Sequence, residues 1–147
     1  MNTDLITTAL SKYGLTEAPG VQDNPVILQM AKDAGFPDYN HDSIAWCSLF
    51  ANWVAWKSGY QRSMKLNARS WLTIGQPVSN PELGDVVILW REQKAGELGH
   101  VGFFINQDTK GSIFLLAGNQ ADQVEIAPFP KERLLGFRRL AKPTVNQ

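Results

Sequence analysis

The sequence predicts an α+β fold in which N-terminal helices pack on an antiparallel sheet of about five strands. In the first third of the chain, apolar residues recur at helical spacing and the segments are bounded by capping residues. After Asn67 the pattern changes to short β-branched and aromatic runs that are separated by turn residues. Neither half can bury its apolar face alone, so we expect a single domain over residues 1–147.

Three helices are expected, and each has a start or stop signal. They span Asp4 to Lys12, Pro25 to Ala34 and Ser43 to Ser58. Asn24 precedes the proline of the second helix and is a favourable cap, while Gly59 follows the third in the usual C-terminal position. The third helix is the most strongly predicted of the three.

The five predicted strands follow one another with short connections, which favours an antiparallel meander. They are Gly84 to Trp90, His100 to Asn106, Ser112 to Asn119, Gln123 to Pro128 and Leu134 to Leu140.

Composition excludes several classes of function. The net charge is zero, which gives no electrostatic attraction for nucleic acid or an anionic membrane. No apolar run approaches the length of a membrane span, and the first residues do not resemble a signal peptide. A single cysteine suits synthesis in a reducing compartment. We therefore expect a soluble, monomeric protein made in the cytoplasm.

That cysteine, Cys47, has two interpretations. On a helix it shares an apolar stripe with Phe50, Ala51 and Val54, which is typical of a small buried core residue. It also lies near the helix start, after Asp42, which is a candidate cap. There the helix dipole favours a thiolate, as in cysteine nucleophiles. A nucleophile also needs a base.

His100 in "GHVGFF" is the candidate base, since it begins an apolar strand flanked by glycines. If the loop "DTKG" closes a four-residue hairpin, Gln107 pairs with Ser112 and His100 pairs with Asn119. Directly opposed residues share a face of the sheet, so Asn119 would orient the imidazole, with Gln120 as the alternative. A slip of one residue would remove this juxtaposition.

The segments "DSIAWCSLFANWVAWKSG", "ARSWLTIGQPV", "GDVVILWR", "GHVGFFI" and "AGNQADQVEIAPF" resemble, in that order, small papain-like peptidoglycan hydrolases of the NlpC and CHAP superfamily. The subgroup includes phage lysins and bacterial cell-wall hydrolases. The resemblance implies a papain-like fold with Cys47 as nucleophile, His100 as general base and Asn119 or Gln120 as the orienting group. No cofactor or metal is implied.

For substrate contact, the candidates are Trp46, Asp42, Trp71 and Gln120, although core packing explains the tryptophans equally simply. The implied reaction is cleavage of the muramoyl-L-alanine bond or of a bond within the stem peptide, and the choice between them is open. An acyltransferase on the same scaffold and a catalytically silent domain that binds wall fragments or a protein are the alternatives.

The resemblance also suggests where the protein acts. Without a signal peptide, a phage endolysin released through a holin or an antibacterial effector carried by a secretion system would reach the cell wall. An immunity protein that binds the cleft is expected as a partner only in the effector case.

Overall fold

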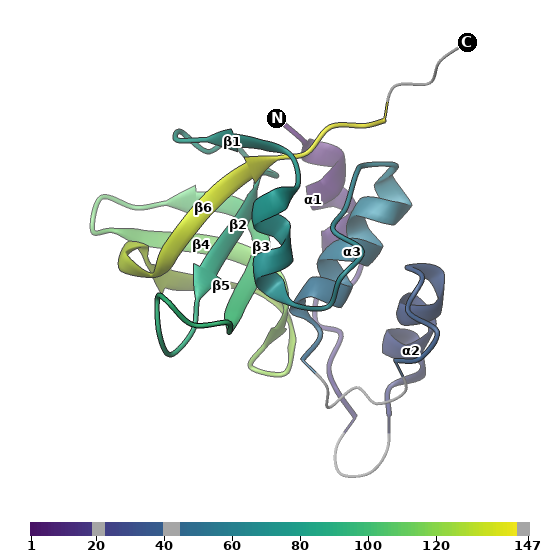
Figure 1. The fold of residues 1–147 in the computed structure, drawn as a ribbon. Helices are drawn as coiled ribbons and strands as arrows, with labels where there is room; N and C mark the ends of the chain where they lie inside the picture. Colours follow the sequence, from purple (N-terminus) through teal and green to yellow (C-terminus); the bar gives the residue numbers. More distant parts are fainter. Residues whose placement is uncertain (19–22, 40–44, 144–147) are drawn as a thin grey trace.

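The computed structural model describes residues 1–18, 23–39 and 45–143. Three helices, α1 (Thr3–Leu10), α2 (Pro25–Asp33) and α3 (Cys47–Ser58), gather beside one six-stranded antiparallel sheet (Figure 1). The α+β architecture predicted from the sequence is confirmed. Within the described residues, no helix is both long and apolar enough to span a bilayer.

The sheet has the order β1-β6-β2-β3-β4-β5. Its strands are β1 (Gln76–Val78), β2 (Val86–Trp90), β3 (Gly99–Gln107), β4 (Ser112–Gln120), β5 (Gln123–Pro130) and β6 (Leu134–Arg139). Two short 3₁₀ turns, η1 (Ala68–Thr73) and η2 (Lys131–Arg133), precede β1 and β6. Five of these strands were expected, and β1 is the additional one. The sequence did not indicate β1 because this strand has only three residues, contains a proline and lies at the edge of the sheet.

Helix α3 is the central element of the helical layer. It contacts β3, β4, α1 and α2, and nine of its twelve residues are buried. The helix begins at Cys47, because Ala45 and Trp46 are not helical. The predicted start at Ser43 is therefore wrong, and Ser43 itself lies outside the described residues. The predicted end is confirmed, since Gly59 adopts a left-handed φ of 80°.

The sheet covers two apolar clusters, one on each face. The larger one lies against the helices and includes Val101 and Phe103, whereas Phe104 and Leu115 belong to the cluster on the opposite face. Alternation along β3 explains this division, because successive side chains point to opposite faces.

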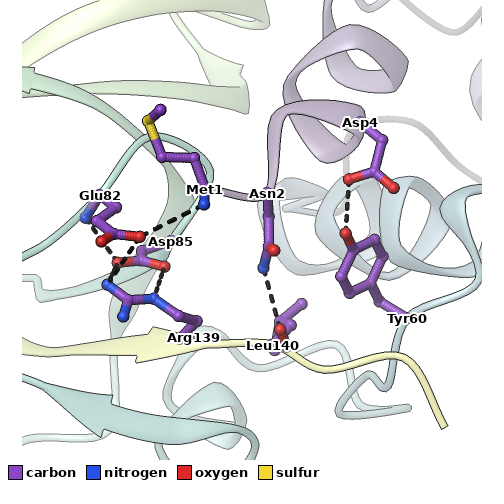
Figure 2. Close-up of polar contacts among 8 residues, drawn as sticks. All are labelled: Met1, Asn2, Asp4, Tyr60, Glu82, Asp85, Arg139 and Leu140. Atoms are coloured by element: carbon purple, nitrogen blue, oxygen red, sulfur yellow. Dashed lines mark hydrogen bonds and ion pairs between the residues drawn. The ribbon is translucent and has the colours of Figure 1, made fainter. Parts of the chain in front are cut away.

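Polar contacts fasten the start of the chain to the sheet (Figure 2). Asp85, which is fully buried, accepts hydrogen bonds from the guanidinium of Arg139 at 3.0 and 2.8 Å, joining the start of β2 to the end of β6. Asn2 Nδ2 donates to Leu140 O at 3.0 Å, and the Tyr60 hydroxyl donates to Asp4 at 2.6 Å. These contacts hold α1 against the sheet and α3.

Candidate active site

The first helical turn of α3 places Cys47 beside β3. Cys47 is 6% exposed and belongs to the same buried cluster as Val101, the residue that follows His100. Burial raises the pKa of the Cys47 thiol, while the N–H groups of Val101 and Ser48 and the charge of Arg91 oppose that rise. The helix-start argument for a thiolate is therefore outweighed by desolvation, and the thiol is neutral in the resting protein.

His100 begins β3 and is buried, with 6% of its surface exposed. Burial lowers the pKa of His100 to about 4, the hydrogen bond with Gln120 opposes this, and the charges of Arg133 and Arg91 lower it further. The imidazole is consequently neutral near pH 7. A neutral imidazole is the form that accepts a proton.

Gln120 fixes the tautomer of that imidazole. Its Nε2 donates to the carbonyl oxygen of Glu125 at 2.6 Å, which leaves its Oε1 facing His100 Nε2 at 3.0 Å. Because an amide oxygen only accepts, His100 Nε2 carries the proton and donates it to this bond. The lone pair of the neutral ring is then on Nδ1.

The ring of His100 is therefore bonded to Gln120 rather than to Asn119. The β3–β4 register of Phe103 opposite Leu116 agrees with the predicted one. Nearer the loop the prediction is wrong, because Gln107 pairs with Ile113 and an irregularity lies between Phe104 and Asn106.

A second irregularity in β4 explains why Gln120, and not Asn119, forms the hydrogen bond with His100. Asn119 has a left-handed φ of 59°, and the β4–β5 register shifts between Ala117 and Gln120. Asparagine tolerates this conformation better than most residues. The bend interrupts the alternation of side chains, so the residue after Asn119 reaches His100.

Of the remaining candidates for substrate contact, the two tryptophans are buried in the core. Trp46 and Trp71 are both 0% exposed, so the expectation that they touch substrate is wrong. Both are large side chains that fill the core, and both indole nitrogens have internal acceptors: Trp46 donates to Glu17 at 2.7 Å and Trp71 to Ser48 at 2.9 Å. Asp42 lies outside the described residues.

A cavity of about 510 Å³ adjoins His100 on the side of Gln120. Its lining includes Arg91, Glu125, Phe129 and Arg133, and Asn119 also faces it. We call it the His100 cavity. The sequence analysis did not single out the two arginines; Arg91 begins the loop "REQKAGELG" before His100, whereas no local signal marks Arg133.

No metal site competes with this arrangement within residues 1–18, 23–39 and 45–143. No group of three or more His, Cys, Asp or Glu side chains is placed there to hold an ion.

Comparison with known proteins identifies the family and supports the fold. A family model described as the CHAP domain matches residues 38–119, more than half of the chain. No curated protein matches. Solved structures with the same fold include two bacterial proteins. An NlpC/P60 family protein from Bacillus cereus is 23% identical, with a TM-score of 0.60, and covers 93% of this chain. A protein from Staphylococcus aureus, described as similar to lipoprotein of the NLP/P60 family, is 17% identical with a TM-score of 0.57 and also covers 93%.

The chain spans about two fifths of each of these two longer proteins, 39% and 40% respectively. The family match rests on the segment that contains Cys47, His100 and Asn119. The chain therefore belongs to the CHAP domain family.

Proposed function

We propose that this protein hydrolyses an amide bond of peptidoglycan, in the stem peptide or between muramic acid and L-alanine, with Cys47 as the nucleophile. One observation carries the proposal. The buried thiol at the start of α3 lies against the backbone just beyond His100, whose ring Gln120 fixes with Nδ1 free to accept a proton. Family membership supplies the substrate class.

In the proposed first step, Nδ1 of His100 takes the thiol proton as the sulfur attacks the amide carbonyl. Both groups start uncharged, and the raised pKa of the thiol and the lowered pKa of the imidazole both oppose the transfer, so the proton moves as the sulfur attacks and not beforehand. The N–H of Cys47 is at the first helical position, where it has no partner within the helix, so it can donate to the oxyanion.

The imidazolium then gives its proton to the leaving amine, and the sulfur keeps the acyl group as a thioester. Water, deprotonated by the same imidazole, attacks the thioester and releases the acid. Gln120 accepts from Nε2 throughout and stabilises the ring orientation through both steps.

The test is incubation of purified protein with Gram-negative sacculi, with released fragments identified by mass spectrometry. We expect the wild type to release fragments whose new ends define the bond, and Cys47→Ala to release none. Cys47→Ser is the matched variant, since it keeps the size of the side chain but is a much weaker nucleophile. Circular dichroism confirms that both variants fold.

Equal release by wild type and Cys47→Ala, or release by neither, would reject Cys47 as the nucleophile. Products that carry an added amine instead of water would identify the acyltransferase alternative. Binding of sacculi without any release would favour the silent wall-binding alternative.

A further inference from the structure

The His100 cavity contains two arginines for which the mechanism has no use. Arg91 follows the last residue of β2, and Arg133 ends η2. Both side chains line the cavity beside His100, the base of the proposed reaction. Among the described residues, neither guanidinium forms an ion pair with a carboxylate.

Arg133 is held in place while its terminal nitrogens stay available. Its Nε donates to Trp90 O at 2.9 Å, and its guanidinium lies 5.4 Å from the centre of the Phe129 ring. The same ring is 5.2 Å from the imidazole of His100. Trp90 Nε1 donates in return to Glu132 O at 3.1 Å, so the end of β2 and η2 are joined twice. Arg133 is thus prepositioned beside the base.

Arg91 is positioned by its loop. Arg69 of η1 donates to the carbonyl oxygens of Gln93, Lys94 and Leu98 at 2.8–3.0 Å, and Arg91 N donates to Leu98 O at 3.1 Å. These bonds close the loop between β2 and β3. The loop is therefore fixed where it carries Arg91 to the cavity.

The two positive charges act on each other and on the catalytic pair. Burial lowers the pKa of Arg133, and the charge of Arg91 lowers it further. The charges of both arginines also lower the pKa of His100. Two neighbouring cations without an anion are unfavourable unless a ligand neutralises them. Arginine is the side chain best suited to hold a carboxylate, through paired N–H donors.

Two acidic side chains also line the cavity. Asp122 and Glu125 line it from the β4–β5 hairpin, and Glu125 accepts from Gln123 Nε2 at 3.1 Å. A carboxylate is repelled by these two acidic side chains and attracted by the two arginines. The charge distribution therefore orients an anionic ligand with its carboxylate toward Arg91 and Arg133.

We propose that the His100 cavity is a subsite for a carboxylate on the leaving-amine part of the substrate, held by Arg91 and Arg133. This inference rests on the proposed function. His100 gives its proton to the leaving amine, so that fragment departs beside the imidazole, and the same imidazole lines the cavity. The two arginines then determine specificity by selecting fragments that carry a free carboxylate near the cleaved bond.

The activity test compares native sacculi with sacculi whose carboxylates have been converted to amides by carbodiimide and ammonia. Wild type should lose about tenfold or more in kcat/KM on the amidated wall, because charged hydrogen bonds to the carboxylate are lost. The double variant Arg91→Gln/Arg133→Gln should lose as much on the native wall and be indifferent to amidation. The loss should be in KM rather than kcat.

Two controls separate a subsite from general charge and from structural damage. Lys32→Gln/Lys110→Gln removes the same charge from exposed positions and should leave the preference for the native wall unchanged. Arg91→Lys and Arg133→Lys keep the charge but not the paired donors, so each should restore part of the preference.

A binding test is independent of hydrolysis. N-acetyl-L-alanine, added to the Cys47→Ala protein, should shift the NMR signals of the Arg91 and Arg133 Nε–H groups and of the His100 ring in a saturable way. N-acetyl-L-alaninamide should not. The inference is overturned if both probes leave those signals unchanged, or if wild type cuts native and amidated walls equally. Binding without cleavage of any wall would support the subsite and reject the proposed hydrolysis.

Discussion

Replacing Gly118 by alanine tests how closely α3 must approach β4 for the site to form. A Cβ built at Gly118 would lie 2.7 Å from two atoms of the Trp46 ring and 2.8 Å from Cβ of Phe50. Ordinary contact begins at about 3.4 Å, so the start of α3 must retreat by about 0.7 Å. Cys47 lies between Trp46 and Phe50 and moves with them.

The expected cost follows from that displacement. Overpacking of this kind destabilises a core by about 1–3 kcal/mol, which for a chain of this length lowers Tm by roughly 3–10 °C. A shift of the nucleophile approaching 1 Å reduces the rate by up to about 100-fold. We therefore expect Gly118→Ala to fold with a lower Tm and to lose most of its release of wall fragments.

The assay combines thermal unfolding with fragment release, and Gly96→Ala is the matched control. At Gly96 the nearest atom to an added Cβ is 3.3 Å away, in an exposed loop, so little change is expected. In a double-mutant cycle, Trp46→Phe should recover part of the loss by shortening the ring. Wild-type Tm and activity in Gly118→Ala would refute the proposed close fit between α3 and β4.

Three further predictions concern the base and the sheet. Gln120→Ala should reduce fragment release by roughly tenfold or more, because His100 loses its orientation, whereas the exposed Gln107→Ala should not; equal rates would remove Gln120 from the mechanism. NMR titration should give His100 a pKa of about 4. This folded-state pKa is below the ordinary 6.5, so the unfolded chain binds more protons than the folded chain between these values. About 3 kcal/mol of stability is therefore lost as the pH falls from 6.5 to 4. The variant His100→Gln should lack this pH dependence of stability. Asp85→Asn should lower the free energy of unfolding by about 3 kcal/mol, because it breaks the buried pair with Arg139. If the pair is the cause, adding Arg139→Gln to Asp85→Asn should cost less stability than Arg139→Gln does in the wild type.

Much of the fold could be predicted from periodicity and turn residues, because helix α2 and strands β2 to β6 carry strong local signals. Helix α3 shows the limit of such signals. Asp42 is a candidate cap and Ser43 the predicted first residue, yet Ala45 and Trp46 are not helical and the first helical residue is Cys47. The Trp46 ring is buried against Gly118, a tertiary contact between residues 72 positions apart that no local signal contains.

The outline of the site could also be predicted from local sequence patterns. Cys47 and His100 stand in distinctive local patterns, and the hairpin register led to the region of β4 that reaches the imidazole. That Gln120 bonds His100 in place of Asn119 depends on one left-handed residue and on a shift in strand pairing. Loop length alone does not predict either feature. Arg133 could not be found, since only the folded chain places η2 beside His100.

The pairing of the sheet has a practical consequence for anyone shortening this protein. The segment that matches the family model ends at Asn119, inside β4, and therefore omits β5 and β6. Without them β4 has an open edge, and Asp85 loses Arg139. At the other end, Gly14 N donates to Val124 O and Val124 N to Leu15 O, so the early residues extend the sheet beyond β5. A fragment cut to residues 38–119 is thus expected to aggregate through its exposed strand edge, and expression work should keep residues 1–143 intact.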